Sequence, residues 1–436
     1  MWAYDSVFYQ IYPLGFCGAP KENTGGEPVS RIKKIGDFAE HIKSVGADAV
    51  YLSPIFESDR HGYDTRDYRT IDRRLGTNND FKEVCERLHK NGIKVVLDGV
   101  FNHVGRGFFA FQDVCQNRGN SVYRNWFHID FGGNSNYNDG FWYKGWEGHY
   151  ELVELNLGCE EVVRYLLDSV TYWINEFDID GIRLDVAYCL SSEFMQRLRE
   201  HCNSIKPEFF LVGEIIHGDY NRLLNSGLDS CTNYECYKGL YSSFNSMNMF
   251  EIAHSLGNRF GAEDWCQYRG RRLLNFVDNH DVTRIASCLT NKEHLTLVWA
   301  TMFAMPGIPC IYYGSEWGAT GEKAEGDDAL RPSFDEPTTN ELTRYIARLS
   351  SAYKQSSAIR YGSYKNIVIT NKQLVFERVY EGERIFVAIN ADAERYTAHF
   401  DSNCGRATDL ISGDTVDFGG GLELDAYRVY YLKCER

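Results

Sequence analysis

Residues 94–103 read KVVLDGVFNH, an apolar run that ends at the carboxylate of Asp98, and this pattern decides the fold that we expect. Three later stretches repeat it: GIRLDVA at 181–187, FFLVGEI at 209–215 and NFVDNHD at 275–281. Each predicts a short buried strand that stops at Asp or Glu. In a (β/α)₈ barrel the strand ends meet over one opening, so these carboxylates would gather there. We therefore expect an α/β protein built on a (β/α)₈ TIM barrel with an acidic site.

The flanking sequence alternates between strand and helix patterns, as a barrel requires. Predicted strands cover 7–12, 49–52, 93–97, 181–184, 209–212, 228–232, 273–276 and 308–312; predicted helices cover 35–45, 160–177, 192–204, 295–305, 340–353 and a segment capped by 78–80 that runs to 90. The alternation breaks in an Asn-, Gly- and aromatic-rich stretch, which is too rich in aromatics for a disordered linker. Near the C-terminus, short alternating runs predict an antiparallel β-sandwich. We expect a barrel of 1–102 and 158–355, an inserted subdomain of 103–157 after strand three, and a C-terminal β-sandwich domain of 356–436.

Length and composition suit a globular protein with one barrel and one appended domain. The chain has 436 residues, of which 43% are hydrophobic and 25% charged. The aromatic content of 14% suits a sugar site, although a large aromatic core explains it better. The net charge of −15 argues against nucleic acid or an anionic membrane as partner, and fits a neutral substrate or mere solubility equally well.

The cysteines point to a reducing compartment. There are 13, an odd count, and none is paired at zinc-ligand spacing. Cys85, Cys288 and Cys310 lie inside apolar segments, which favours buried thiols. The N-terminal MWAYDSVFYQIYP has no basic start, and no segment approaches the ~20 apolar residues of a membrane span. We expect a cytoplasmic protein.

Two of the strand-end carboxylates have the surroundings that hydrolysis of a glycosidic bond requires. Arg183 and Asp185 project to the same face, so the guanidinium is expected to hold Asp185 ionised; a structural ion pair is the alternative. Glu214 follows a very apolar strand, which predicts a raised pKa and a general acid; a cap on the next turn is the alternative. Neighbouring strands lie ~4.8 Å apart, which matches the ~5 to 5.5 Å between the two carboxyls of a retaining glycosidase.

Other polar residues follow strands three and seven. Asp281, preceded by Asn279 and His280, supplies a third carboxylate that can hold ring hydroxyls in the transition state. Asp98 is expected to orient Arg183, and His103 follows at the end of strand three.

These four stretches resemble the conserved regions of the alpha-amylase family (glycoside hydrolase family thirteen), in the same order and at similar spacing. HGYDTRDY at 61–68 resembles that family's strand-two loop, and the order of domains is similar as well. The resemblance implies no cofactor for the chemistry and assigns the roles as follows: Asp185 nucleophile, Glu214 acid/base and Asp281 stabiliser, with Tyr63, His103, Arg183 and His280 around the central subsite, His61 and Asp64 nearby, and Asp327 and Arg331 at a sugar further from the cut.

Within the family the chain is most similar to the neopullulanase, cyclomaltodextrinase and maltogenic amylase branch. The similarity is carried by FQDVCQN (111–117), YRNWFHI (123–129), NEFDIDGIRLDVA (175–187) and PGIPCIYYGSEWGATG (306–321). The chain departs from it by starting at strand one, where that branch usually has an N-terminal β-domain that helps it dimerise. Ile216 stands where the branch has Trp, and Tyr188 and Cys189 stand where starch-cleaving members often have Lys and His. Oligomeric state and cyclodextrin use are therefore open, with a monomer preferred.

A structural calcium ion is common in the family. Asn102 is one candidate ligand, and the stretch 134–139 offers further oxygens, although an ordinary polar loop is the preferred interpretation.

Taken together, the sequence predicts a retaining hydrolase of α-1,4 bonds in imported maltooligosaccharides or cyclodextrins, with α-1,6 cleavage open. One alternative is a transglycosidase or isomerase on the same carboxylates, of the trehalose synthase, sucrose phosphorylase or amylosucrase type. Another is a non-catalytic glycan-binding relative, which is disfavoured because all three carboxylates are present.

Overall fold

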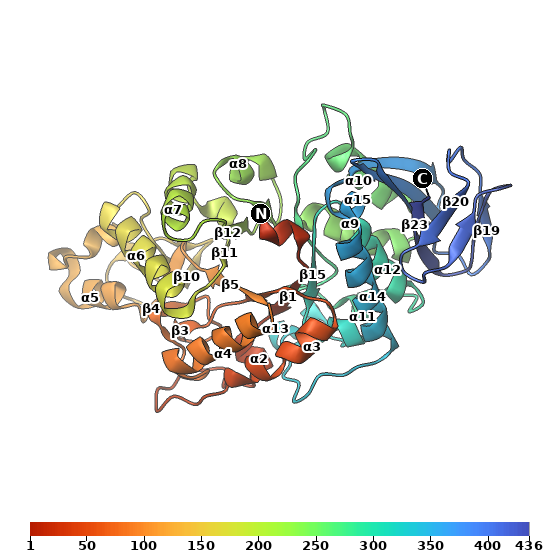
Figure 1. Ribbon diagram of the computed structural model, residues 1–436. Helices are drawn as coiled ribbons and strands as arrows, with labels where there is room; N and C mark the ends of the chain where they lie inside the picture. The colour runs from red at the N-terminus through yellow and green to blue at the C-terminus, as the bar shows by residue number, and fades with distance from the viewer. Residues whose placement is uncertain (436) are drawn as a thin grey trace.

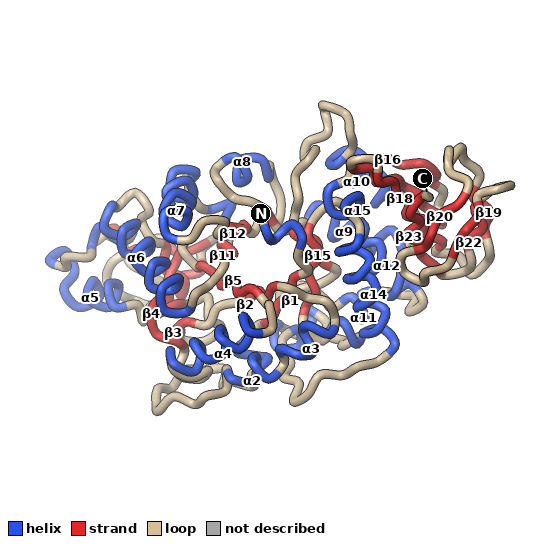
Figure 2. Tube along the Cα trace, viewed as in Figure 1, coloured by secondary structure: helices blue, strands red, loops and turns tan. Residues whose placement is uncertain are grey.

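The computed structural model describes residues 1–435, and its centre is a parallel eight-stranded sheet rolled into a barrel (Figures 1 and 2). Its spatial order is β13-β12-β11-β5-β2-β1-β15-β14, and a single parallel bridge between Thr232 and Leu274 closes the circle. The predicted barrel is therefore confirmed. Its strands are β1 (Phe8–Ile11), β2 (Ala49–Leu52), β5 (Lys94–Gly99), β11 (Gly181–Leu184), β12 (Phe210–Gly213), β13 (Ser230–Cys231), β14 (Leu274–Phe276) and β15 (Ile308–Tyr312).

Apolar residues cover both faces of this sheet, as they must in a parallel sheet surrounded by helices. Phe8, Val96 and Phe210 fill the barrel interior in one buried cluster. Their neighbours along the strands, such as Tyr9 and Val95, belong to the second cluster between the strands and the helices. This alternation explains why the strands read as unbroken apolar runs.

The helices form the outer layer of the barrel (Figure 2). They are α1 (Pro13–Phe16), α2 (Lys33–Asp37), α3 (Ala39–Ser44), α4 (Asn78–Lys90), α6 (Glu160–Phe177), α7 (Ser192–Ile205), α8 (Tyr220–Asn225), α9 (Tyr234–Asn245), α10 (Phe250–Phe260), α11 (Ile285–Cys288), α12 (His294–Ala304), α13 (Asp327–Leu330), α14 (Glu341–Gln355) and α15 (Ser357–Tyr361). The first predicted helix, 35–45, is in fact two, since α2 and α3 meet at Phe38. Helices α9 and α10 were not predicted.

The N-terminal cap of α4 also differs from the prediction. Thr77, not residues 78–80, is the cap: its hydroxyl accepts the backbone N–H of Asp80, and the Asp80 carboxylate accepts the N–H of Thr77. This capping box satisfies two helix donors at once.

The loops that follow strands β2 and β5 carry small sheets of their own. β3 (Phe56–Ser58) pairs with β4 (Thr65–Ile71). The insertion contains α5 (Phe109–Asn117), a three-stranded sheet of β6 (His103–Gly105), β10 (His149–Glu154) and β9 (Gly145–Trp146), and a pair of β7 (Ile129–Asp130) with β8 (Trp142–Tyr143). Phe111 packs edge-on against Phe127 and Tyr143, so the aromatic residues of this stretch build its core.

The C-terminal region is an antiparallel β domain, as predicted. Five of its strands match predicted runs: β16 (Ser363–Ile369), β17 (Gln373–Tyr380), β18 (Glu383–Asn390), β19 (Tyr396–Ala398) and β23 (Arg428–Cys434). Three short ones were not predicted: β20 (Arg406–Asp409), β21 (Thr415–Asp417) and β22 (Leu422–Leu424). A six-stranded sheet and the β19-β22 pair enclose the core of this domain.

Among residues 1–435, no helix combines the length and the apolar character that crossing a bilayer demands. All 13 cysteines are free thiols.

Candidate active site

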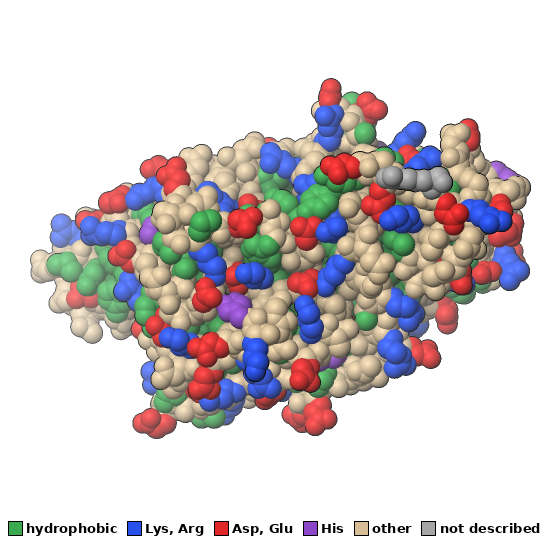
Figure 3. All heavy atoms as spheres, in the orientation of Figure 1, with side chains coloured by type: hydrophobic (Ala, Val, Ile, Leu, Met, Phe, Trp, Pro, Cys, Tyr) green, Lys and Arg blue, Asp and Glu red, His purple; other side chains and the backbone are tan. Residues whose placement is uncertain are grey.

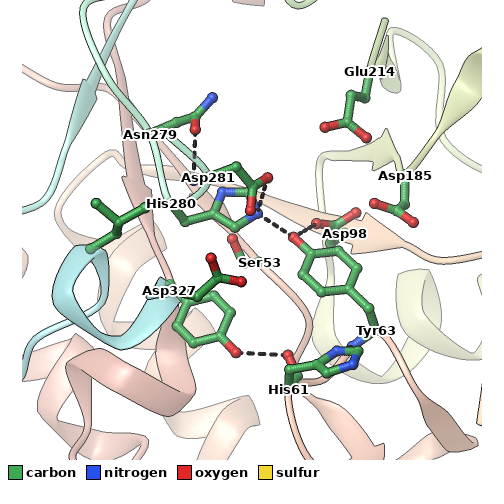
Figure 4. Close-up of polar contacts among 12 residues, drawn as sticks. Ser53, His61, Tyr63, Asp98, Asp185, Glu214, Asn279, His280, Asp281 and Asp327 are labelled. Atoms are coloured by element: carbon green, nitrogen blue, oxygen red, sulfur yellow. Dashed lines mark hydrogen bonds and ion pairs between the residues drawn. The ribbon is translucent and has the colours of Figure 1, made fainter. Parts of the chain in front are cut away.

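Asp185 and Glu214 lie side by side at the carboxyl end of the barrel (Figure 4). Each is the first residue after its strand, β11 or β12, and these strands pair in register with Leu184 opposite Gly213. Adjacent parallel strands are ~4.8 Å apart, so two acids that follow a matched register position are neighbours. Both side chains are buried.

A single guanidinium holds these acids together. Arg183 Nη1 donates to Asp185 Oδ1 at 2.8 Å and to Asp98 Oδ1 at 3.0 Å, while Nη2 lies 2.7 Å from Glu214 Oε1. Arg183 is only 2% exposed, so these contacts lie in a medium that screens charge poorly. Asp98 orients Arg183, as the sequence suggested.

The charges in this cluster do not balance, because three buried carboxylates share one cation. Burial raises the pKa of Asp185 to about 7 even though Arg183 opposes it, and it raises the pKa of Glu214 to about 7 in the same way. We predicted that Arg183 would hold Asp185 ionised at neutral pH, but burial and the charge of Asp98 outweigh the ion pair and raise the pKa. The cluster retains a proton near neutral pH, which is the state that acid catalysis requires.

The backbone turn after Asp185 fixes the position of Glu214. Val186 has φ 39 and ψ 47, a left-handed conformation that a β-branched residue rarely adopts. In that conformation its N–H donates to Glu214 Oε2 at 2.9 Å. The strained turn thus points a backbone donor at the carboxylate.

Asp281 lies across the site at the end of a hydrogen-bonded chain (Figure 4). Gln10 donates to Nδ1 of His280 at 2.8 Å, so that Nε2 carries the proton and faces Asp281 Oδ2 at 3.1 Å and the Tyr63 hydroxyl at 2.6 Å. The Tyr63 hydroxyl in turn donates to Asp98 Oδ2 at 3.2 Å. Burial lowers the pKa of His280 to about 3, which keeps the ring neutral in this tautomer.

The charge of Asp281 differs from that of the other two acids. Burial alone would raise its pKa, but the Nε2–H of His280 that faces it and the charge of Arg331 outweigh that effect and lower it. Arg331 Nη2 donates to Asp281 Oδ1 at 2.9 Å. Asp281 is therefore ionised under conditions in which the Arg183 cluster retains its proton.

His103 presents an unused ring nitrogen to the site. Its Nε2 is buried without a hydrogen-bond partner and lies 3.8 Å from Asp185 Oδ2, while Asn102 contacts Nδ1 at 3.2 Å. Burial lowers the pKa of His103 to about 3, so the ring is neutral. A buried polar atom without a partner costs free energy, and a bound hydroxyl group would satisfy it.

A cavity of about 680 Å³ brings most of the predicted residues together: His61, Tyr63, His103, Asp185, Glu214, Asp281, Asp327 and Arg331 all line it. Arg183 and His280 are buried directly behind the lining. Asp64 does not line the cavity; it accepts the N–H of Gly62 at 3.1 Å and shapes the loop that carries Tyr63.

Several lining residues were not predicted as parts of the site. They come mainly from the tip of the insertion and from β-α loops whose patterns carry no chemical motif: Trp146, Glu147, His149, Glu151, Leu152, Tyr188, Ile216, Tyr234, Val282 and Lys323. Tyr188 and Ile216 were noted in the sequence only as departures from the family. Tyr188 donates to Glu147 Oε1 at 3.2 Å and so ties the insertion to the barrel rim.

The 134–139 stretch does not fit a calcium ion. Arg106 Nη1 and Nη2 bind the Asp139 carboxylate at 2.9 and 2.7 Å, and Asn134 Oδ1 accepts the backbone N–H groups of Ser135 and Gly140. Within residues 1–435, no group of three or more His, Cys, Asp or Glu side chains is placed to hold a metal. A calcium ion at Asn102 stays a prediction.

The comparisons with known proteins agree with this geometry. The sequence matches the alpha-amylase catalytic domain family over residues 10–356. It is 30% identical to a cyclomaltodextrinase from Thermoanaerobacter pseudethanolicus, across 99% of this chain and 78% of that protein, and 30% identical to an intracellular maltogenic amylase from Bacillus subtilis, across 82% and 63%. The structure superposes on cyclic alpha-maltosyl-(1→6)-maltose hydrolase from Arthrobacter globiformis, in complex with its cyclic substrate, with a TM-score of 0.83, 27% identity and 99% of both chains covered.

The chain therefore belongs to the alpha-amylase family. It is a glycoside hydrolase of the branch that includes cyclomaltodextrinases, maltogenic amylases and neopullulanases.

Proposed function

We propose that this enzyme hydrolyses α-1,4-glucosidic bonds of maltooligosaccharides with retention of configuration, through a covalent intermediate on Asp185. Glu214 donates its proton to the glycosidic oxygen as the Asp185 carboxylate attacks the anomeric carbon. A water molecule then attacks the glycosyl ester, Glu214 takes its proton, and the sugar leaves with its original configuration.

The single observation that carries this proposal is the shared guanidinium. Arg183 contacts Asp185 and Glu214 at 2.8 and 2.7 Å, from strands paired in register. Two carboxyls on one guanidinium at the ends of adjacent strands favour the short separation of a retaining enzyme over the wider gap that an inverting mechanism uses. It also explains how one acid stays protonated beside another that must be charged.

The remaining residues have supporting roles in the same proposal. Asp281, ionised and fixed by Arg331 and His280, would hold hydroxyls of the reacting sugar. The Nε2–H of His103 would donate to one hydroxyl oxygen, because Nδ1 accepts from Asn102. The ring of Tyr63, which stacks on His280 at 5.8 Å, would pack against the sugar face. Asp327, Arg331 and Lys323 would contact the next sugar.

The substrate class and location rest on support from relatives. The Arthrobacter globiformis hydrolase is named for a maltose-based substrate, and the name of the Bacillus subtilis protein describes it as maltogenic and intracellular. Thirteen free thiols suit a reducing compartment. We propose that the enzyme acts on linear or cyclic maltooligosaccharides in the cytoplasm, with an accessory activity on α-1,6 bonds.

The test compares Asp185→Asn and Glu214→Gln with Glu151→Gln, a variant of another acid that lines the same cavity. The first two are expected to lower turnover of maltotriose by at least about 10⁴-fold with the fold intact, and the third by less than about tenfold. NMR during hydrolysis should show the α-anomer first. Near-normal turnover in either of the first two variants, or a β-anomer as the first product, contradicts the mechanism.

A digest panel separates the linkage and acceptor alternatives. Maltotriose, cyclodextrin, pullulan, panose and sucrose are incubated with and without phosphate. Glucose and maltose as products support hydrolysis. Trehalose, glucose 1-phosphate or longer glucans would instead assign a transglycosidase or isomerase on the same carboxylates.

A further inference from the structure

A second cavity, of about 340 Å³, lies at the opposite end of the barrel and is lined by five arginines: Arg269, Arg271, Arg272, Arg360 and Arg378. Its other lining residues are small, apolar or aromatic, and none of them is Asp or Glu. It lies where the segment after α10 approaches the N-terminal turn of the chain and α15 (Figure 1). Pro306 and Gly307 of its wall directly precede β15, so this is the amino end of the strands.

A cavity lined by five arginines and by no acidic residue is unusual in this acidic protein. The whole chain has a net charge of −15, and basic and acidic side chains are mixed over the face in Figure 3. Two of the five arginines have carboxylate partners: Arg360 pairs with Asp5 and Arg269 with Asp264. Within the described part of the chain, the other three form no ion pair within 4.0 Å.

Arg378 is the most unusual of these three. It is 1% exposed, and its donors bind only backbone carbonyls, with Nη1 2.6 Å from the oxygen of Ala304 and Nη2 2.9 Å from that of Gly362. Burial lowers the pKa of its guanidinium to about 10, and the charge of Arg272 adds to this effect. A buried cation without a counter-charge is costly, because neither water nor a carboxylate compensates it.

Arg271 and Arg272 line the cavity and have N–H groups that are not used in hydrogen bonds. The Nε of Arg272 is buried without a partner, and its guanidinium stacks over the rings of Tyr361 at 4.5 Å and Tyr4 at 5.1 Å. Arg271 Nη2 donates one hydrogen bond, to the uncharged side-chain oxygen of Asn225 at 2.7 Å. Aromatic rings hold the Arg272 guanidinium plane in place without neutralising it.

We propose that this cavity is a binding site for a phosphate group, carried as inorganic phosphate or as a small phosphate monoester. A planar guanidinium matches phosphate oxygens with two parallel donors, and three uncompensated guanidiniums match a dianion. A volume of about 340 Å³ lies within the ~300 to 1,000 Å³ of small-molecule sites and leaves room for a small group beside the phosphate. Because the lining comes from both the barrel and the C-terminal strands, a bound anion would fasten the two together.

This inference does not depend on the proposed hydrolysis, since the two cavities share no residue. The competing explanation is purely structural: the arginines serve only to bind carbonyls and rings. In that case removing them would lower the melting temperature but leave it indifferent to phosphate.

The experiment measures the melting temperature and the calorimetric binding of inorganic phosphate and of glucose 6-phosphate, with glucose and an equal ionic strength of sodium chloride as controls. We expect a saturable rise of about 2 to 4 °C with the phosphate compounds and none with the controls. A larger effect of glucose 6-phosphate than of phosphate assigns a monoester, and equal effects assign the free anion.

Arg271→Gln and Arg272→Gln, singly and together, test the residues, and Arg395→Gln is the matched control because it lies far outside the cavity and is 78% exposed. The double variant is expected to lose at least about tenfold in phosphate affinity while keeping its activity on maltotriose; Arg395→Gln should bind as the native protein does. Absence of saturable binding to the native protein, or unchanged binding in the double variant, would overturn the proposal.

Discussion

Arg183 and Arg378 are both almost fully buried, yet their surroundings are opposite. Arg183 contacts the carboxylates of Asp98, Asp185 and Glu214, whereas Arg378 contacts backbone carbonyls alone. Burial would lower the pKa of either guanidinium; the acids reverse that for Arg183 and raise its pKa well above the ordinary value, but the pKa of Arg378 falls to about 10. The two buried cations thus differ in their partners: three carboxylates contact Arg183, two more than its charge can balance, whereas no carboxylate contacts Arg378.

The largest expected effect comes from removing each cation in turn. Arg183→Met leaves three buried carboxylates without a counter-charge, so turnover should fall by at least about 10³-fold and unfolding free energy by about 3 to 5 kcal/mol at pH 8. The carboxyl pKa values are raised in the fold, so this penalty should shrink as the pH falls through 7 toward 5 and the acids become protonated.

Arg378→Met provides the contrast, because no carboxylate faces it. Its loss of stability should be the same at pH 5 and pH 8, and its turnover should be native. Thermal unfolding of both variants across this range measures the difference. If Arg183→Met were pH-independent as well, the charge imbalance in the cluster would be refuted.

The next largest effect concerns the hydroxyl groups that contact Asp98. Tyr63→Phe removes the donor that links Asp98 to His280, and we expect a drop of about 10- to 100-fold in kcat/KM. Tyr51→Phe is the matched control, since its hydroxyl donates to the same Asp98 oxygen at 3.1 Å but does not line the cavity. Equal losses of activity in the two variants would mean that Tyr63 acts only by supporting Asp98.

The pH profile follows from the shared proton. Since the pKa of Glu214 is raised to about 7, the proton that the leaving oxygen needs is lost above that pH. We expect kcat/KM to fall by about tenfold per pH unit on the alkaline side, in the native enzyme and in Arg378→Met alike. Rates measured from pH 5 to pH 9 check this, and a flat profile up to pH 9 would contradict it.

The smallest effect is a gain in stability from removing one excess acid. The pKa of Glu214 is raised from 4.5 to about 7, so the fold loses stability as the pH rises from about 4.5 to about 7, and the full loss is present above that range. Glu214→Gln should therefore melt about 1 to 3 °C higher than the native protein at pH 8, with the difference vanishing near pH 4.5. Glu151→Gln is the control, because it removes an acid of the same cavity whose side chain is half exposed.

The barrel could be predicted because its strands are continuous apolar runs, several of which are followed by an Asp or Glu residue. Residues 181–185 show a buried strand and a catalytic acid within five positions, and residues 94–98 show a buried strand and the acid that orients Arg183. By contrast, β20, β21 and β22 have only three or four residues each, too few for an alternating pattern to stand out. Helices α9 and α10 were not predicted because the preceding strand, β13, is only two residues long. Without a clear strand pattern, the sequence did not show where the next strand-to-helix connection begins.

The site was predictable where a residue's role depends on its own strand, and not where it depends on tertiary surroundings. Asp185, Glu214 and Asp281 follow their strands, so the sequence places them. The pKa of Asp185 depends on burial and on Asp98, 87 residues away along the chain, which no local spacing reveals. Trp146 and Glu147 reach the cavity only because the insertion folds back over the barrel, and the arginines of the second cavity converge from three separate segments.

The barrel has one weak seam. Every other neighbouring pair of strands is joined by two or more register positions. Between β13 and β14 the backbones are joined only by the bridge between Thr232 and Leu274 and by the hydrogen bond from the N–H of Asn233 to the oxygen of Leu274. Amide hydrogens between β13 and β14 should therefore exchange with deuterium by local opening, faster than amides whose exchange requires global unfolding of the barrel. Because β14 begins two residues after Arg272, an anion bound in the second cavity would slow that exchange and help keep the barrel closed at its least bonded pair of strands.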